Sequence, residues 1–375
     1  MGKLDILIKD FNKQYKEEIA ARGIPKIETQ KIPFSSPRAN YMTYGGIPRG
    51  RIIEFAGEEN GGKTTTALDI VANAQVLFKQ EWEDEIKELE ELEKPKKEQS
   101  TRLDYLKSRG PKHIVYADCE NTLDEEWSRL LGVNPDEMIL LKPMSQSAEQ
   151  IFEMLLQMIE TDEVGLVIID SLGVMLSAQA YEKSMEEKTY GGIAAALTLF
   201  SKKAELLCTK YNCTLIGINQ MREDMNSPYG GMITTGGKGW KHNCSVRLMF
   251  QKGSYIDERG NEIKRSSESP AGNLVMINIA KTKVCKPDRR VGFYTLRYDT
   301  GIDIIADTIE VALKYGIINQ AGSWFNFVDI DTGEIISDDE GEVIKLQGKP
   351  NVIEYLEDNQ YLLDEINNKI KALST

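Results

Sequence analysis

The sequence predicts an α/β protein with an open, mostly parallel central sheet and helices between the strands. Three observations favour this fold. Short apolar runs rich in β-branched residues recur through the centre of the chain, helical patterns separate them, and a glycine-rich motif stands where one run meets a helix. Buried parallel strands show such near-continuous apolar runs, and strand–helix alternation is typical of a sheet covered on both faces.

The bulk composition is that of an ordinary folded protein. Its 375 residues are 41% hydrophobic and 28% charged, which suits one large domain with appendages. Five cysteines without a CxxC pair and only two histidines argue against a zinc site and favour free thiols in a reducing cytoplasm. The net charge of −13 argues against a broadly basic surface, although a local groove can still be basic. No apolar run approaches the roughly 20 residues that a membrane span needs.

The first segment, residues 1–32, is predicted to form a helical arm. Its apolar residues Leu4, Ile8, Phe11 and Tyr15 recur at helical spacing. The stretch that follows contains Pro and Gly at several positions up to residue 48, and we interpret it as a linker into the core.

The core is expected to span residues 33–300. Its predicted parallel strands are residues 52–56, 113–117, 165–169 and 214–218, and its helices are residues 63–79, 145–159 and 192–211. Three later β-rich runs, residues 246–251, 274–282 and 292–298, have no long helices between them. We expect these runs to extend the sheet as hairpins.

Residues 79–112 interrupt this rhythm with a dense run of charges. One helical stripe and the start of another, beyond Pro95, are formed by Trp82, Ile86, Leu89 and Leu92 and by Leu103 and Leu106. The pattern predicts a helical hairpin inserted between the first helix and the second strand. It is either a solvated excursion with a narrow packing stripe or a partner-binding arm.

The last segment, residues 301–375, is predicted to be a small α/β C-terminal domain. Residues 304–315 are amphipathic and end at a glycine, and residues 352–373 form another helical stretch.

A phosphate-binding loop is the strongest motif of the chain. Residues 57–64 match GxxxxGK[ST], follow a predicted strand and precede a helix, which is the context that the motif requires. Backbone N–H groups and the helix dipole would bind phosphate, and Lys63 would neutralise it. The predicted nucleotide-binding residues are Gly57, Glu58, Glu59, Asn60, Gly61, Gly62, Lys63, Thr64 and Thr65.

A magnesium site is expected beside this loop. The strand of residues 165–169 ends in Asp170, and a carboxylate there can hold Mg²⁺ through water while Thr64 offers its hydroxyl. Four apolar residues followed by Asp are a weak signal alone, because many strands end this way. The phosphate-binding loop earlier in the chain strengthens it.

Two further strand ends supply candidate catalytic groups. Glu120 follows the strand of residues 113–117 and is the candidate general base for an attacking water. Gln220 follows the strand of residues 214–218 and can hydrogen-bond a γ-phosphate. The plainer readings are a carboxylate at a helix N-terminus for Glu120 and a loop amide for Gln220.

The order of these motifs resembles the bacterial RecA recombinase family. The similar stretches are GGIPRGRIIEFAGEENGGKTT, YADCENTLDEEWSRLLGV, VIIDSLGVM, GINQMR followed by TTGGKGW, and IAKTKVCKP. The resemblance runs from about residue 32 to residue 373, apart from residues 79–112 and 328–347. The departures, chiefly the insert, leave room for a phage-encoded member of the UvsX kind.

The resemblance implies further roles at matching positions. Asp124 and Trp127 align with residues that contact adenine, although the family commonly has Tyr at the second. Lys281 and Lys283 align with a lysine pair that reaches the γ-phosphate of the neighbouring protomer, so they join Lys63, Glu120 and Gln220 as catalytic candidates.

DNA binding is expected, by the same resemblance, from two loops of about residues 177–192 and 221–240. The candidate DNA-binding residues are Arg222, Thr234, Thr235, Gly236, Gly237 and Lys238. Where the family has an arginine after the first loop, this chain has Ala196. The first loop also carries several acidic residues, so its contribution to DNA binding stays open.

The resemblance implies a DNA-dependent ATPase that forms helical filaments on single-stranded DNA and exchanges strands with homologous duplex DNA. ATP and Mg²⁺ are the implied cofactors. The implied partners are further copies of the chain, loading or mediator proteins and a single-strand binding protein, with no membrane. The expected location is the cytoplasm, associated with the nucleoid, or the host cytoplasm for a phage protein. The alternatives are a hexameric helicase of the same fold and a regulator without useful turnover.

Overall fold

The computed structural model describes residues 2–16, 20–21, 29–182, 192–223, 232–264, 269–337 and 341–374. The chain divides into two compact units, Met1–Gln30 and Lys31–Thr375.

The described residues of the first unit form the helix α1 (Lys3–Tyr15), as the sequence predicts. No residue of this helix is buried, and its large apolar side chains Leu4, Leu7, Phe11 and Tyr15 are all exposed. The Asn12 side chain and the Ala20 backbone form two hydrogen bonds with each other, which hold residue 20 against the helix. The unit therefore presents an apolar helix face that it does not cover itself.

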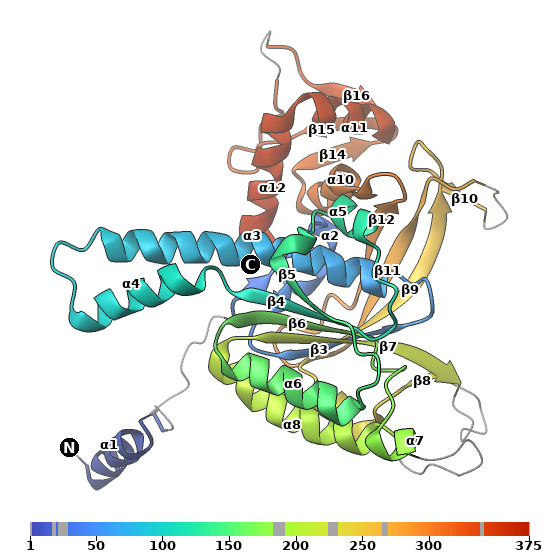
Figure 1. Cartoon of the computed structure of the whole chain (residues 1–375). Helices are drawn as coiled ribbons and strands as arrows, with labels where there is room; N and C mark the ends of the chain where they lie inside the picture. The colour runs from blue at the N-terminus through green and yellow to red at the C-terminus, as the bar shows by residue number, and fades with distance from the viewer. Residues whose placement is uncertain are drawn as a thin grey trace. The chain divides into compact units, whose positions relative to one another are not determined.

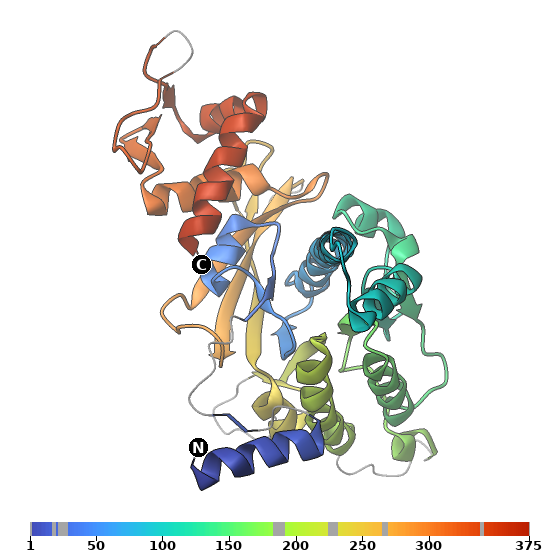
Figure 2. The ribbon, with the colours of Figure 1, turned by 90° about the vertical axis from the view of Figure 1, so that its left-hand side faces the viewer.

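The second unit is built on one large sheet (Figures 1 and 2). Its main path has the order β13-β12-β11-β9-β3-β7-β6-β4-β5. The parallel half consists of β3 (Ile52–Gly57), β4 (His113–Asp118), β5 (Met138–Leu141), β6 (Val164–Asp170) and β7 (Thr214–Glu223), and β9 (Val246–Ile256) also runs parallel to β3. The predicted parallel strands are confirmed, and β5 is an additional edge strand.

The antiparallel half is the predicted extension by hairpins. It consists of β11 (Gly272–Thr282), β12 (Val291–Arg297) and β13 (Gly301–Ile302), which follow β9 across the sheet. Two short strands lie off the main path: β8 (Met232–Thr234) pairs with β7, and β10 (Glu262–Ile263) pairs with β9.

Helices cover both faces of the sheet. On one face, α3 (Lys63–Glu90) packs on the side chains of Ile53 and Phe55. On the other face, α6 (Ala148–Glu160) and α8 (Ala194–Tyr211) pack on the alternate strand residues, such as Ile52 and Val115, whose side chains point to that face. Short helices α5 (Glu125–Leu130), η1 (Pro135–Glu137), α7 (Ala178–Glu182) and α9 (Gly237–Asn243) complete this part. Because strand side chains alternate between faces, fully apolar strands are what this two-sided packing requires.

The segment after the arm is not a linker, so this prediction is wrong. It forms β1 (Lys31–Ile32), α2 (Pro37–Thr43) and β2 (Ile47–Pro48), and Ile32, Phe34 and Met42 belong to the main core cluster. Its prolines suit these positions, because Pro37 begins α2 and needs no helical donor there.

The predicted helical hairpin between the first helix and the second strand is confirmed. It consists of the outer part of α3 and of α4 (Lys97–Arg109), which projects beside the sheet (Figure 1). The Trp82 indole donates to the carbonyl of Leu106 at 2.8 Å, and Arg102 pairs with Glu85 at 2.8 Å. Leu106 is fully buried and the other apolar residues of the predicted stripes are half-buried except Leu92, which is exposed, so the two helices cover most of these stripes between them.

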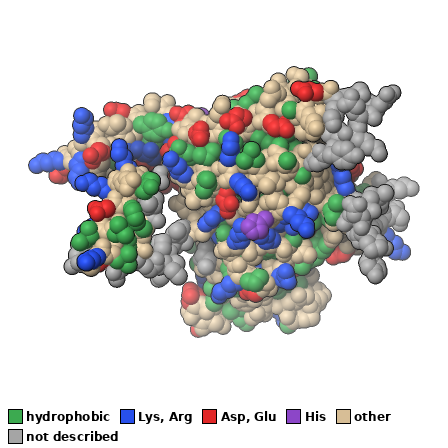
Figure 3. Space-filling view, turned by 90° about the horizontal axis from the view of Figure 1, so that it is seen from below, with side chains coloured by type: hydrophobic (Ala, Val, Ile, Leu, Met, Phe, Trp, Pro, Cys, Tyr) green, Lys and Arg blue, Asp and Glu red, His purple; other side chains and the backbone are tan. Residues whose placement is uncertain are grey.

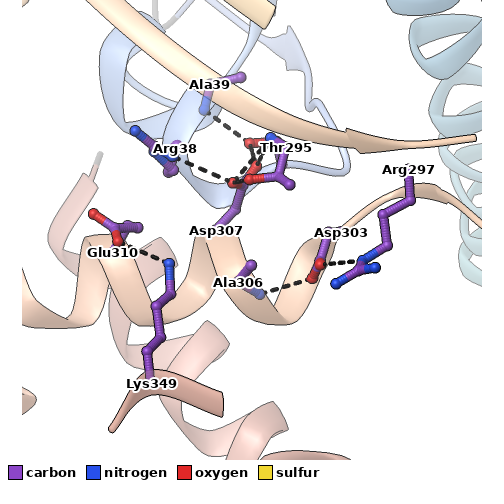
Figure 4. A network of polar contacts seen from close by, with 10 residues as sticks. Arg38, Ala39, Thr295, Arg297, Asp303, Ala306, Asp307, Glu310 and Lys349 are labelled. Atoms are coloured by element: carbon purple, nitrogen blue, oxygen red, sulfur yellow. Dashed lines mark hydrogen bonds and ion pairs between the residues drawn. The ribbon is translucent and has the colours of Figure 1, made fainter. Parts of the chain in front are cut away.

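The C-terminal part has its own core. It contains α10 (Ile304–Tyr315), β14 (Ile318–Ala321), β15 (Trp324–Phe327), β16 (Lys345–Gln347), α11 (Lys349–Asp358) and α12 (Gln360–Ser374). The predicted helix of residues 352–373 is thus two helices. The carboxylate of Asp307 joins this part to the core (Figure 4): it accepts hydrogen bonds from Ser36 and Thr295 and lies 3.7 Å from Arg38.

Candidate functional site

Four neighbouring strands bring the predicted catalytic groups to one edge of the sheet. The strands β3, β7, β6 and β4 lie side by side and parallel, so their carboxyl ends meet. The phosphate-binding loop follows β3, Gln220 lies on β7, Asp170 ends β6 and Glu120 follows β4. Ligand sites of open α/β sheets lie at this edge.

The phosphate-binding loop holds its lysine close to the chain. The Lys63 ammonium donates to the carbonyls of Gly57 at 3.2 Å and Glu58 at 2.6 Å. Burial lowers the pKa of Lys63, and the carboxylates of Asp170 and Glu120 oppose this effect. Gly62 has a φ of +92°, and a Cβ there would lie 2.9 Å from Val275, so glycine is required.

The predicted metal ligands lie together beside this loop. The Thr64 hydroxyl donates to Asp170 Oδ2 at 2.8 Å, and the Tyr116 hydroxyl donates to the same oxygen at 2.8 Å. Burial raises the pKa of Asp170, and these two hydrogen bonds oppose the rise. A hydroxyl and a carboxylate at this spacing are oxygen ligands of the kind that Mg²⁺ takes beside a nucleotide, so the residues fit the implied ion.

The predicted general base and the predicted phosphate sensor are in contact. Glu120 Oε1 accepts a hydrogen bond from Gln220 Nε2 at 3.0 Å and another from the Ser171 hydroxyl. The alternative roles, a carboxylate at a helix N-terminus for Glu120 and a loop amide for Gln220, do not account for this contact between residues 100 positions apart. A γ-phosphate that attracted Gln220 would therefore also change the surroundings of Glu120.

The pocket beside this cluster extends from the phosphate loop to an aromatic end. Residues 60–65 of the loop and Trp127 line it. The adjoining hollow is lined by Trp127 and Asp124, whose carboxylate caps α5 by accepting from the Trp127 N–H at 2.7 Å. The side chains of Glu58 and Glu59 are exposed and do not line the pocket.

Three polar lining residues were missed by the sequence reasoning. They are Lys252 on β9, Asn273 on β11 and Tyr298 directly after β12. The Tyr298 hydroxyl donates to Asn273 Oδ1 at 2.8 Å. No motif marks these residues, because only the pairing of the antiparallel strands brings them to the pocket.

The two predicted lysines of the neighbour's site lie far from this pocket. Val275 lines the pocket near the start of β11, whereas Lys281 lies at its other end. The stretch from Val275 to Lys281 spans roughly 20 Å at the rise of an extended strand. The Lys281 ammonium donates to the carbonyls of Lys241 and His242 at 2.8 and 2.7 Å. Burial, and next the charge of Lys283, lower the pKa of Lys281.

The predicted DNA-binding residues surround the second loop, of which residues 224–231 lie outside the described residues. Arg222 on β7 donates to the carbonyl of Gly173 at 3.0 Å. Thr234 and Gly236 are buried, whereas Gly237 and Lys238 are exposed and Thr235 is half-buried. The Thr234 side chain therefore faces the protein. Of the first loop, residues 183–191 lie outside the described residues.

The fold and the site define the class: a P-loop nucleotide-binding protein with the predicted base, metal-side carboxylate and phosphate sensor on neighbouring strand ends. A family model of the RecA N-terminal domain matches residues 3–80 and 106–303, and a model of the RecA C-terminal domain matches residues 306–374. The chain therefore belongs to the RecA family.

Relatives named Protein RecA align with most of the chain. Those of Ruminococcus albus and Thermus aquaticus are each 28% identical, over 93% and 98% of this chain and 74% and 93% of their own lengths. The Protein RecA of Fusobacterium nucleatum is 29% identical over 92% of this chain and 77% of its own length.

The outer hairpin falls between the two matched segments of the first family model, because residues 81–105 are not matched. This unmatched segment lies within the predicted insert of residues 79–112. Among the described residues, none of the helices has the length and apolar character that a membrane crossing requires.

Proposed function

We propose that this chain polymerises on single-stranded DNA with ATP, promotes homologous pairing and strand exchange, and hydrolyses ATP to ADP and phosphate between protomers. Membership of the RecA family supports ATP-dependent recombination and a DNA-dependent ATPase activity. The cluster of Lys63, Thr64, Glu120, Asp170 and Gln220 supports turnover rather than a regulator without activity, because such a site keeps every group that hydrolysis needs.

The position of Lys281 carries the assembly part of the proposal. This residue and Lys283 lie at the far end of β11, where they cannot reach the pocket of their own chain. A head-to-tail copy can bring them to the γ-phosphate, and two ammonium groups there would stabilise the charge of the transition state. Hydrolysis would then depend on assembly.

Each residue of the cluster has a definite part in this chemistry. The P-loop N–H groups and Lys63 bind the β- and γ-phosphates, and Thr64 and Asp170 would hold Mg²⁺, which neutralises charge on those oxygens. Glu120 accepts a proton as a water attacks the γ-phosphorus and the bond to the ADP oxygen breaks. Gln220 leaves Glu120 to bind the γ-phosphate, so its position reports which nucleotide is bound.

Local positive charge reconciles DNA binding with a net charge of −13. Lys238 and Lys241 belong to α9, which begins within the end of the second loop, and Lys281 lies against that helix. Figure 3 shows lysine and arginine side chains gathered around a histidine on one face of the molecule. Contacts from such residues and from backbone N–H groups to phosphates are independent of base sequence, as strand exchange requires.

Mixed filaments provide the test of the shared site. A Lys63→Ala protomer lacks a working pocket but supplies the far lysines, and a double Lys281→Ala, Lys283→Ala protomer has the opposite defect. In an equal mixture, about a quarter of the head-to-tail interfaces pair an intact pocket with intact lysines, so a comparable share of wild-type turnover returns. Each variant alone is expected to show almost none.

The control is a mixture of the Lys63→Ala protein with a double Lys281→Ala, Lys283→Ala protein that also carries Lys63→Ala, which leaves no intact pocket. Absence of recovery in the first mixture would contradict a site shared between protomers. Electron microscopy with single-stranded DNA and a non-hydrolysable ATP analogue separates the assemblies. Helical filaments support the proposal, and closed rings would favour the hexameric helicase.

The arm is proposed to hold neighbouring protomers together. The apolar face of α1 is exposed within its own unit, and a second copy of the chain can cover it. The domain division into residues 1–32, 33–300 and 301–375 belongs to the same proposal, as do mediator and single-strand binding proteins as partners and a cytoplasmic, nucleoid-associated location.

A further inference from the structure

A buried carboxylate lies directly behind the phosphate-binding loop. Glu54 is in the middle of β3 and is fully buried, although its strand neighbours Ile53 and Phe55 are apolar core residues. It accepts hydrogen bonds from three side chains: Asn219 at 2.9 Å, Trp240 at 3.0 Å, and Arg247. A charge at this depth requires such donors, and these come from three different elements.

The Asn219 contact leads towards the nucleotide. Asn219 is the residue before Gln220 on β7, and Gln220 in turn holds Glu120 at 3.0 Å. The Asn219 amide nitrogen has two N–H groups: one binds Glu54, and the other binds the carbonyl of Thr235 at 2.9 Å. A single amide therefore connects the phosphate-sensing strand, the buried carboxylate and the end of the second loop.

The other two contacts lead to the same loop from its far side. Trp240 is fully buried on α9, the helix with which the loop returns to the core. Its ring packs against β7, because a Cβ added to Gly217 would lie 2.6 Å from it. Arg247 is the second residue of β9 and also lies near the Thr234 hydroxyl, at 3.5 Å. Glu54 thus binds both the strand that enters the loop and the elements that leave it.

We propose that Glu54 is a positioning residue that couples the γ-phosphate side of the nucleotide site to the second DNA loop. The inference rests on the proposed function, because it requires DNA at that loop. Glu54 lies on β3 before the phosphate-binding loop. It would act only through the groups that it binds: Asn219, which precedes Gln220 and also binds Thr235, and Trp240 and Arg247.

The coupling follows from the hydrogen bonds. When Gln220 turns from Glu120 to a γ-phosphate, the end of β7 and Asn219 adjust with it. Asn219 moves relative to Glu54 and Thr235 only if the hydrogen bonds of this group rearrange, so the loop end responds. The Asn219 Oδ1 atom is buried and has no hydrogen-bond partner among the described residues, so a rearranged amide can gain a bond.

A second buried carboxylate provides the matched control. Asp307 is as completely buried as Glu54 and also accepts several hydrogen bonds. Its partners Ser36 and Thr295 belong to the scaffold and to the junction with the C-terminal part, not to the second loop. If Glu54 had only a structural role, neutralising either carboxylate would have similar effects on DNA binding. Coupling instead predicts that only the change at Glu54 alters how nucleotide affects DNA binding.

The test measures the coupling factor directly in the full-length protein. The affinity for a fluorescein-labelled oligothymidylate is measured with Mg²⁺, with and without adenylyl-imidodiphosphate, and the ratio of the two dissociation constants is the factor. Glu54→Gln keeps the shape but removes the charge, and we expect the factor to fall at least about tenfold, within the usual range of such couplings. We expect Asp307→Asn to keep the wild-type factor within about twofold.

A gentler variant covers the case in which Glu54→Gln does not fold. Trp240→Phe removes the indole N–H donor to Glu54 and part of the ring volume but keeps an aromatic side chain, and we expect an intermediate factor. If both folded variants keep the wild-type factor, or if Asp307→Asn loses it equally, the inference is wrong and the proposed function stands. If the wild type itself binds no oligothymidylate in the presence of the analogue, the proposed function fails and the inference fails with it.

Discussion

The parallel and antiparallel halves of the main sheet differ in how far their functional side chains lie from the chain's own nucleotide pocket. In the parallel half, Lys63, Glu120, Asp170 and Gln220 all lie at the carboxyl ends of adjacent strands and form one cluster. In the antiparallel half, β11 begins at the same pocket, and Lys281 near its other end lies roughly 20 Å away at the rise of a strand. Strand direction thus separates the groups at the chain's own pocket from the lysine that we propose serves a neighbour's site.

The largest effect is expected in the parallel half at the phosphate loop. Lys63→Ala removes the ammonium that the loop carbonyls hold in place. We expect DNA-stimulated ATP turnover to fall by at least about 1,000-fold, since both phosphate binding and charge neutralisation are lost. Phosphate release with saturating single-stranded DNA measures this. Strand exchange at the normal rate with ATP would show that the loop is not the working site.

Glu120→Gln should separate chemistry from binding in the same half. The amide keeps the size of the side chain but cannot accept the proton of the attacking water, so we expect kcat to fall about 100- to 1,000-fold. Affinity for an ATP analogue should change little. Glu125→Gln is the matched control, because Glu125 is an exposed residue of α5 that pairs with Arg129. Unchanged turnover in Glu120→Gln would favour a regulator without catalysis.

The antiparallel half should respond differently. Lys281→Ala is expected to lower kcat about 10- to 100-fold through the neighbour's site, because it removes one of two cations from the transition state. The isolated protomer should bind an ATP analogue as the wild type does. Lys286→Ala is the control, since Lys286 is exposed on the segment that follows. A weakened affinity of the isolated protomer for the analogue would place Lys281 in its own pocket and remove the contrast between the halves.

The smallest effect on chemistry, but a clear effect on stability, is expected where the antiparallel half meets the C-terminal part. Burial raises the pKa of Asp307 to about 7, although Arg38 opposes this. The folded protein therefore holds a proton that the unfolded chain releases near pH 4. This contribution to the free energy of unfolding is complete below that pH and is lost as the pH rises through about 7.

Asp307→Asn should remove this pH dependence. Urea unfolding at several pH values between 4 and 8 measures the free energy of unfolding of the wild type and of the variant. We expect the difference between these two free energies to change by a few kcal/mol across this pH range. ATP turnover of the folded variant should stay close to that of the wild type. A parallel pH profile in both proteins would show that Asp307 does not titrate in this range.

The sequence and the structure agree best where local patterns are strong. The strands at residues 52–56 and 165–169 and the helix at residues 304–315 could be predicted, because continuous β-branched runs and amphipathic spacing are local signals. The linker prediction failed because prolines at residues 33 and 37 favour a turn locally, yet Ile32 and Phe34 pack into the main core. The predicted end of the first helix at residue 79 was also wrong, because α3 continues to Glu90 without a break.

By itself, the sequence determined the class of chemistry. A phosphate-binding loop between a strand and a helix, and polar residues after apolar runs, locate Lys63, Thr64, Asp170, Glu120 and Gln220, because parallel strands end at one edge. Only the tertiary structure decided which residues close the pocket and which connect it to the loop. Tyr298, Asn273 and the partners of Glu54 meet through strand pairing and helix packing between residues far apart in the chain, and no local pattern records such contacts. Glu54 itself left one signal, a charge inside an apolar strand, and its meaning required the three donors around it.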